Sequence, residues 1–403
     1  METAYPFLVS AGKTFLEAIA GRGVLIPVVL LIAWLYWRVY TAAGTRDAVP
    51  AVFRATLIST AAGIAGGLIG SIMLMLFGVD LASVGMGYLF VLALLLACTQ
   101  ARFICVAYAG GLLSLTHLVF NYPVIDVSQL MALVAILHMV EAVLIFFTGG
   151  IDPVPVYLRH PAGTIGGFNL QRFWPIPLIA LMSGNVSGMS LGSETWWPLL
   201  GRSFGEQEVG RMLLPFVALL GYGETTSTTD PVVQSRHSAV FLGLYSLLLM
   251  ALALAGTRHP MAQLAAAMFG PLGHEAVIAL NRWREESRPP LYIHDGHGVM
   301  VLDVERGSVS EAAGIRRSDV ILTVNGIAVS DADELAERLR SDWAGSRLGL
   351  RRSGQDCFVF LAKRPNQPHG LILIPPRHVI PAGTSGFAAL LLSKLLQGRK
   401  ILP

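Results

Sequence analysis

The stretch "RGSVSEAAGIRRSDVILTVNGIAV", from Arg306 to Val329, contains the signals that decide the fold of the C-terminal part of this chain. It predicts, in order, a turn, a short helix, a strand, a tight turn and a second strand. Gly314 suits the position just after a helix, where a positive φ is needed. Asn325-Gly326 is typical of a two-residue hairpin turn. The stretch therefore predicts a small domain in which strands and helices alternate.

The residues on either side extend this pattern. "GVMVLDV", residues 298–304, is predicted to be a buried strand. Ser330 with Asp333 forms a box-like N-cap for the helix "DADELAERLR", whose Leu335 and Leu339 share one face. A last hairpin follows in "SRLGLRRSG" and "QDCFVFLAK". The predicted fold is a small α+β domain, a partly open β-barrel or sandwich with two helices.

The rest of the chain has the composition of a membrane protein. Residues 1–281 hold 12 Lys and Arg and 13 Asp and Glu, whereas residues 282–403 hold 17 and 13. Soluble domains are roughly 25% charged, and only the second part approaches that share. The net charge of +3 is too small and dispersed to indicate nucleic-acid binding. We therefore expect a polytopic transmembrane domain (1–281), a juxtamembrane linker (282–291), the α+β domain (292–376) and a C-terminal tail (377–403).

Apolar runs long enough to approach the thickness of a bilayer predict the membrane spans. They are roughly 24–40, 55–77, 82–98, 102–120, 128–148, 173–183, 211–223, 238–256 and 261–281. The runs at 173–183 and 211–223 are short and contain prolines, so they are tilted spans, broken helices or re-entrant pieces whose backbone must be covered by protein. We expect an α-helical bundle of eight or nine helices. The distribution of Arg residues places the N-terminus outside and the C-terminal part in the cytoplasm.

The order of signals in the C-terminal part resembles bacterial PDZ domains. Their usual "GSPAxxAGL" and "GDxIxxVNG" appear here as "GSVSEAAGI" and "SDVILTVNG", with Val309 for the usual proline and Ser318 for the usual glycine. The resemblance implies that an extended partner peptide adds as a strand beside a helix. The residues that match this groove are Gly296, His297, Gly298 and Val299 in the loop, Met300, Val301 and Leu302 on the strand edge, and Leu335 and Leu339 on the helix. The alternative is that Leu335 and Leu339 belong partly to the core.

Two pairs of polar residues lie inside apolar runs. They are His138 with Glu141, and His274 with Glu275. Ionisable groups inside a membrane are costly and are functional candidates by default; these pairs form either a metal or catalytic site, or hydrogen bonds that fix helix packing. We favour the second, and expect no metal and no cofactor.

Membrane zinc proteases need HExxH, and here Ile278 stands where the second histidine is required. The three cysteines, Cys98, Cys105 and Cys357, show no metal-binding spacing and are predicted to be buried, inert thiols. We therefore predict that the chain is not an enzyme.

Four glycines of the second run form two overlapping GxxxG spacings, Gly63 with Gly67 and Gly66 with Gly70. Such glycines let backbones approach closely. We favour packing within this chain over a dedicated dimer face.

The whole layout resembles the MinJ-like proteins of Gram-positive bacteria, which are multi-pass membrane scaffolds with a C-terminal cytoplasmic PDZ domain. The resemblance is carried by "VEAVLIFFTG", "RFWPIPLIAL", "WWP", "LLPFVALLGYGE", the last span leading directly into the PDZ-like module, and "HGLILIP". It departs after Pro376, where residues 377–403 form either an amphipathic membrane-surface segment, a ligand for a neighbouring groove, or a disordered end.

This resemblance implies a scaffold that places the division site by bridging a DivIVA-like coiled-coil protein and a MinD-like ATPase. It further implies a multi-pass protein of the cell membrane, enriched at the septum and poles, with other division proteins and the bilayer as partners and a homo-oligomer allowed. The alternatives are a PDZ-containing regulator or component of membrane proteolysis, and a transporter with a regulatory PDZ domain.

Overall fold

The computed structural model describes residues 4–21, 23–45, 48–161, 163–184, 200, 210–293, 296–341, 345–362 and 369–374. The chain forms two compact units, and both are discontinuous in sequence. Unit 1 comprises Met1–Asp152, Gln171–Tyr222 and Val232–Trp283; unit 2 comprises Pro153–Leu170, Gly223–Pro231 and Arg284–Pro403. The single boundary expected near residue 282 is therefore too simple. The expected tail, 377–403, lies outside the described residues.

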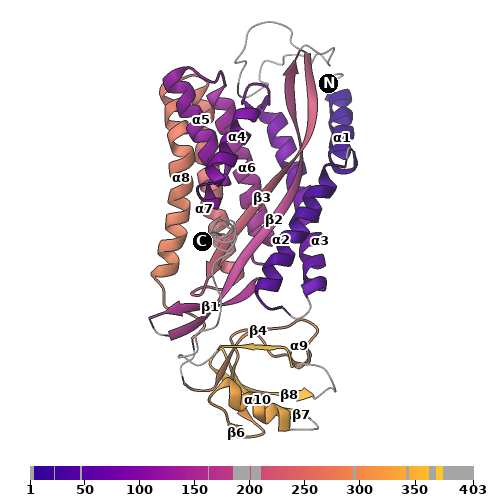
Figure 1. The fold of residues 1–403 in the computed structure, drawn as a ribbon, viewed down its shortest axis with the longest axis vertical. Coiled ribbons are helices and arrows are strands. Elements are labelled where there is room, and N and C mark those ends of the chain that lie inside the picture. The colour runs from indigo at the N-terminus through magenta and orange to yellow at the C-terminus, as the bar shows by residue number, and fades with distance from the viewer. Residues whose placement is uncertain are drawn as a thin grey trace, which may run out of the picture. The chain divides into compact units, whose positions relative to one another are not determined.

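Unit 1 is built mainly from helices (Figure 1). They are α1 (Ala4–Ala20), α2 (Leu25–Ala42), α3 (Ala48–Phe77), α4 (Met86–Ala97), the short 3-10 helix η1 (Ala101–Ile104), α5 (Val106–Phe120), α6 (Val127–Thr148), α7 (Pro231–Gly256) and α8 (Pro260–Glu286). By length and composition, four of these described helices could cross a membrane, namely α2, α3, α6 and α7, while α4 and α5 are shorter apolar helices. The expected last span forms as α8 but is not among those four.

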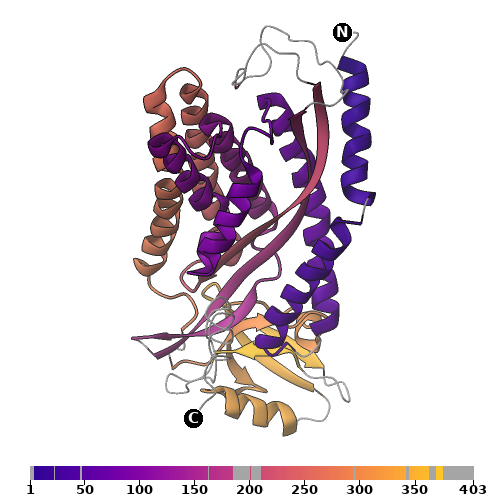
Figure 2. The same cartoon turned by 45° about the horizontal axis from the view of Figure 1, so that its top comes forward.

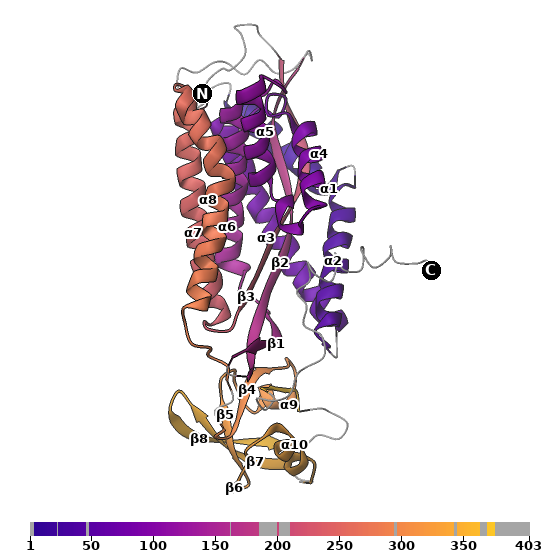
Figure 3. The same cartoon turned by 60° about the vertical axis from the view of Figure 1, so that its left-hand side comes forward.

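Helix α6 is the centre of the bundle. In its most apolar 18-residue stretch 72% of the residues are buried, a larger share than in α2, α3 or α7. Asp126 caps its first turn by accepting a hydrogen bond from the Gln129 backbone N–H at 3.0 Å. Helices α7 and α8 run beside α6 (Figure 3), and Tyr245 of α7 donates to the Gly270 carbonyl of α8 at 2.8 Å. A helix that is apolar on all sides is expected to be enclosed by other elements. The burial of α6 agrees with this expectation.

The two proline-containing runs are strands, so the expectation of spans or broken helices at 173–183 and 211–223 is wrong. They lie in β2 (Gly163–Gly184) and β3 (Gly210–Thr226), which form a long twisted ribbon (Figure 2). Pro175 and Pro177 explain the difference. Two prolines two residues apart break a helix, but they are tolerated in a strand whose outer edge has no strand partner.

The backbone of β2 is covered by protein, as such a segment requires. Alternate residues of β2 direct their N–H groups toward neighbouring helices and loops. Phe173 N–H donates to the Tyr36 hydroxyl at 3.1 Å, Ile179 N–H to the Ser71 hydroxyl at 3.0 Å, and Ser183 N–H to an Asp80 carboxylate oxygen at 2.9 Å. Between the first two stand Pro175 and Pro177, which have no N–H to satisfy. The prolines, which have no N–H, and the three acceptors thus reduce the number of unpaired N–H groups along the outer edge of β2.

The glycines of α3 pack within the chain, as expected, but the partner of one pair is a strand. A Cβ at Gly63 would lie 2.2 Å from the Pro175 carbonyl oxygen, and one at Gly67 would lie 2.1 Å from that of Pro177. Four helical residues rise about 6 Å and two strand residues about 6.6 Å, so the two repeats match. Gly66 and Gly70 face Val140 of α6. The small residues therefore let α3 lie between β2 and α6.

Unit 2 contains the predicted α+β module, and its sheet is open. Its elements are β4 (Val299–Val304), α9 (Val309–Ala312), β5 (Val320–Val324), β6 (Ile327–Ala328), α10 (Ala332–Ser341), β7 (Gly345–Arg352), β8 (Gln355–Ala362) and β9 (Leu371–Leu373). The strand order is β8-β7-β5-β4-β9, with β6 paired to β5. Gly314 has a φ of +80° and Asn325-Gly326 has φ values of +51° and +81°, as predicted.

Two details of the module differ from the prediction. The N-cap of α10 is one residue later than expected, because the Asp331 carboxylate accepts from Glu334 N–H at 2.8 Å while Glu334 reaches back to Ser330 N–H at 3.0 Å. Ser318, which replaces the usual glycine, has a φ of +67°. A side chain is uncommon in this left-handed conformation, so the usual glycine there has a conformational reason.

The compact unit around the module is larger than residues 292–376. Strand β1 (Val154–His160) pairs with the first part of β2, from Val154 with Asn169 to His160 with Gly163. Gly166 N–H donates to the Tyr292 carbonyl at 2.8 Å, and the Phe168 and Tyr292 rings lie 5.2 Å apart. Burial raises the pKa of Tyr292 to about 12. The β1–β2 turn is therefore part of the folded C-terminal unit.

Candidate functional site

The strand predicted to offer an open edge to a partner peptide is interior to the sheet. β4 pairs with β5 through Val299 and Met300, and with β9 through Val301, Asp303 and Val304. The Met300 carbonyl also accepts from Ile374 N–H at 3.1 Å. The prediction of an open edge at Met300, Val301 and Leu302 is therefore wrong. That edge is already paired with β9, which lies about 70 residues later in the chain.

The helix face predicted to line the groove is buried. Leu335 and Leu339 are 1% and 4% exposed and belong to the hydrophobic core of the module. Both side chains therefore lie in the core and do not line an open groove. A charged residue at Leu335 would therefore unfold the module and would not test the groove specifically.

The loop before β4 is shaped by its glycines. Gly296 and Gly298 have φ values of +87° and +84°. A Cβ at Gly298 would lie 2.6 Å from the Ile321 carbonyl oxygen, so only glycine fits there. Gly296 and His297 are exposed. The predicted role of this loop in holding a carboxylate stays a prediction.

The open edge of the sheet lies on β9. The Gly370 carbonyl accepts from Glu305 N–H at 2.8 Å, and Ile374 N–H donates to the Met300 carbonyl, so the two residues that flank β9 direct these groups toward β4. In an antiparallel ladder the alternate residues then direct their backbone groups outward. These are Leu371 and Leu373, whose side chains pack against the core cluster. The Leu373 carbonyl accepts from the Tyr157 hydroxyl at 2.8 Å.

Leu371 and Leu373 lie on the end strand of the sheet, and the structure describes no further strand paired with β9. Such an edge is a template for an added strand. The Gly370 turn before it has a φ of +75°, and a Cβ there would lie 2.3 Å from Ser308. Residues 371–373 thus supply the open strand edge that the sequence predicts at residues 300–302.

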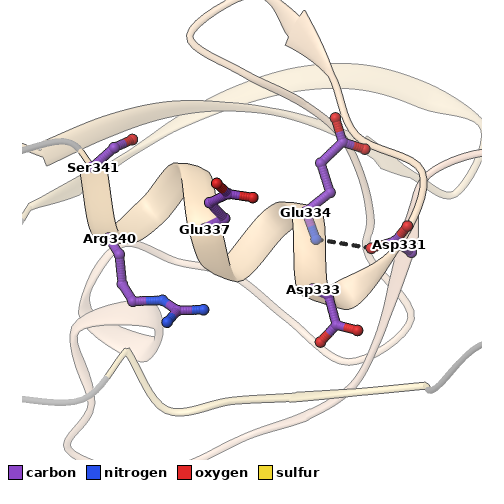
Figure 4. A pocket seen from close by; sticks show the side chains of 6 residues that line it. All are labelled: Asp331, Asp333, Glu334, Glu337, Arg340 and Ser341. Carbon is purple, nitrogen blue, oxygen red and sulfur yellow. Dashed lines mark hydrogen bonds between the residues drawn. The ribbon is translucent and has the colours of Figure 1, made fainter.

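A pocket of about 830 Å³ runs along the polar face of α10 (Figure 4). It is lined by Asp331, Asp333, Glu334, Glu337, Arg340 and Ser341. Glu334 is paired with Arg338 at 2.8 Å, whereas Asp333 and Glu337 are exposed. The pocket therefore presents more negative than positive charge.

The structure brings together two of the four polar residues of the apolar runs, and of the four only His138 is fully buried. The rings of His138 in α6 and His274 in α8 lie 5.2 Å apart. Cys105, at the start of α5, contacts both: its Sγ is 3.1 Å from Nε2 of His138 and 3.7 Å from Nε2 of His274. The ligand atoms of these three residues all lie within 4.8 Å of one another. Glu141 is not a member of this group.

Glu275 is connected to the same group through a tyrosine. The Tyr108 hydroxyl donates to the Glu275 carboxylate at 2.8 Å, and Arg102 lies 3.3 Å from that carboxylate. Cys105, Tyr108 and Arg102 were not recognised from the sequence as partners of the histidines. The three residues are spaced three apart along one segment. This spacing alone does not indicate a site, because the histidines come close only when α5 packs against α6 and α8.

Comparison with known proteins agrees with this architecture. Residues 300–346 match the family model of the PDZ domain. The chain is 26% identical over 189 residues to the cell division topological determinant MinJ of Bacillus subtilis (strain 168). The aligned segment covers 46% of this chain and 45% of that protein, so the chain aligns with less than half of the relative's length.

Proposed function

We propose that this chain is a membrane-embedded, non-catalytic scaffold that captures partner proteins through its PDZ domain and acts in placement of the division site. One observation carries the proposal: a PDZ domain with an open strand edge on β9 follows directly on α8, in a chain with four helices that could cross a membrane. The similarity to a cell division topological determinant supports the division role.

The partners that we propose are a DivIVA-like coiled-coil protein and a MinD-like ATPase, which the resemblance to MinJ-like proteins implies. The PDZ domain would face the cytoplasm, and the protein would be enriched at septa and poles. Strand addition at Leu371 and Leu373 supplies main-chain hydrogen bonds, and the acidic face of α10 favours a peptide with a basic residue.

A fluorescent fusion of the full chain tests the division role. We expect it to concentrate at septa and poles, and we expect deletion of the protein to misplace septa. The reason is that a tether acts only where its partners assemble. Uniform membrane signal combined with normal septum placement would contradict the proposal; loss of a specific proteolytic product on deletion would favour the proteolysis alternative.

Leu373→Pro tests strand addition at β9. Proline removes an outward N–H but leaves the bonds to β4, and proline is tolerated at a strand edge. It also removes the Leu373 side chain from the core cluster, so thermal unfolding of the variant is measured alongside. We expect capture of the purified DivIVA-like or MinD-like protein to weaken roughly tenfold, equivalent to about 1.4 kcal/mol. Binding would be measured on full-length protein in nanodiscs.

Phe358→Ala is the matched control, because Phe358 is 63% exposed on β8 at the opposite edge of the same sheet. Its binding should equal that of the natural protein. If Phe358→Ala loses capture and Leu373→Pro retains it, the partner docks on β8.

A further inference from the structure

The contact between Cys105, His138 and His274 has the composition of a metal site. Each residue comes from a different helix region: Cys105 precedes α5, His138 lies within α6 and His274 lies within α8. His138 is 1% exposed, and the other two are half-buried. One thiolate and two imidazoles are ligands that zinc-class transition metals accept.

The distances match those of a tetrahedral centre. With a metal–sulfur bond of about 2.3 Å and metal–nitrogen bonds of about 2.0–2.1 Å, sulfur and nitrogen on one tetrahedral ion are about 3.5 Å apart. The two sulfur–nitrogen distances here are 3.1 and 3.7 Å. The three ligand atoms all lie within 4.8 Å of one another, so an ion would draw these side chains together without a rearrangement of the helices.

The tautomers of both histidines are set so that their Nε2 lone pairs face the sulfur. His138 Nδ1 lies 2.8 Å from the Val134 carbonyl. A carbonyl can only accept, so Nδ1 carries the proton and Nε2 is free to act as a ligand. This arrangement, in which the second nitrogen donates to a carbonyl or carboxylate, is the usual support of a metal-bound histidine.

His274 is oriented in the same way through Tyr108. The Tyr108 hydroxyl donates its hydrogen bond to Glu275, so its oxygen accepts from His274 Nδ1 at 3.2 Å. Arg102 lies 3.3 Å from the same Glu275 carboxylate oxygen. Two Nε2 lone pairs thus converge on one thiol, which has a single weakly donating hydrogen. Hydrogen bonding alone satisfies only one of the two nitrogens, whereas a cation satisfies both nitrogens and the sulfur.

We propose that Cys105, His138 and His274 bind one zinc-class divalent ion, which ties the start of α5 to α6 and α8. The thiol releases its proton to solvent on binding, and its sulfur becomes a thiolate ligand. The three side chains leave one tetrahedral position for a small ligand such as water. The site is separate from the PDZ domain, so it does not depend on the scaffold function.

Cobalt and zinc binding to the full-length protein in nanodiscs tests the site. The test protein is the double variant Cys98→Ser/Cys357→Ser, in which Cys105 is the only one of the chain's three cysteines that remains. We expect one equivalent of Co²⁺ to give a thiolate charge-transfer band and the visible bands of tetrahedral cobalt, and zinc to displace it and raise the thermal unfolding temperature.

Adding Cys105→Ser should remove the charge-transfer band and weaken zinc binding more than 100-fold, beyond the 10- to 100-fold loss typical of changes to groups that only orient a ligand. Tyr108→Phe should weaken binding roughly tenfold and keep the band, because it removes the acceptor that orients His274. No stoichiometric cobalt in the double variant, or equal zinc affinity with and without Cys105, would show that the cluster is only a hydrogen-bonded packing contact. Unfolding of each variant without metal is measured alongside, so that a failure to fold is recognised.

Discussion

Gly67→Ala is expected to destabilise the membrane unit by about 3 kcal/mol, at the upper end of the range for overpacking. The added Cβ would lie 2.1 Å from the Pro177 carbonyl oxygen, which belongs to the backbone and cannot move by changing rotamer. Either α3 or β2 must shift, and the Ser71 hydroxyl bond to Ile179 N–H would be disturbed with it. Thermal unfolding of the full chain in detergent measures the effect.

Gly87→Ala is the control for this prediction. Gly87 lies in the described helix α4 and a Cβ there would meet nothing within 4 Å. Alanine is the better helix former by up to about 1 kcal/mol, so this variant should lose no stability. If Gly67→Ala left stability unchanged but altered the oligomeric state, the glycines would form a dimer face instead.

Glu285→Ala is expected to destabilise unit 2 by roughly 3 kcal/mol, the upper end of the range for leaving buried hydrogen-bond donors without their acceptor. The Glu285 carboxylate accepts five hydrogen bonds from the segment Thr226–Thr228. Two come from the backbone N–H groups of Ser227 and Thr228, at 2.6 and 3.1 Å. Three come from the hydroxyls of Thr226, Ser227 and Thr228, at 3.2, 2.9 and 2.7 Å, and the Thr226 hydroxyl shares its hydrogen with the Thr229 carbonyl at 3.0 Å.

The cost arises because the donors lose their acceptor in a place that excludes water. Ser227 is 7% exposed, so its N–H and hydroxyl lose their acceptor away from water, whereas the buried Thr226 hydroxyl keeps the Thr229 carbonyl. Hydrogen exchange of residues 226–229 and thermal unfolding measure the loss. Glu286→Ala, at the exposed neighbouring position, should change stability by less than about 0.5 kcal/mol. Equal effects of the two substitutions would mean that the Glu285 network does not hold this segment.

The elements of the PDZ domain could be predicted from the sequence because their signals are local. Gly314 and Asn325-Gly326 act through their own φ values, and the order of strands and helices follows from them. The edge of the sheet could not be predicted in this way. β9 pairs with β4 across about 70 residues, and a three-residue strand has too short a pattern to indicate its partner.

The same distinction between local signals and contacts of distant segments holds for the helical bundle. Apolar runs predicted the helices, but β2 has a similar apolar composition and becomes a strand. Its prolines exclude a helix, and the glycines of α3 and the hydroxyls of Tyr36 and Ser71 make a strand acceptable. Those partners lie about 100 residues or more away from β2, and no local pattern connects them.

The sequence by itself determined that this chain joins apolar helices to a PDZ domain, because composition, periodicity and turn residues act over a few neighbouring positions. Only the tertiary structure decided which strand of the sheet has an open edge and which residues accept hydrogen bonds from the outer edge of β2. It also decided that His138 and His274 meet at Cys105 and not at each other's glutamates. These outcomes depend on contacts between distant segments, and the free energy of such contacts exists only once the segments have packed.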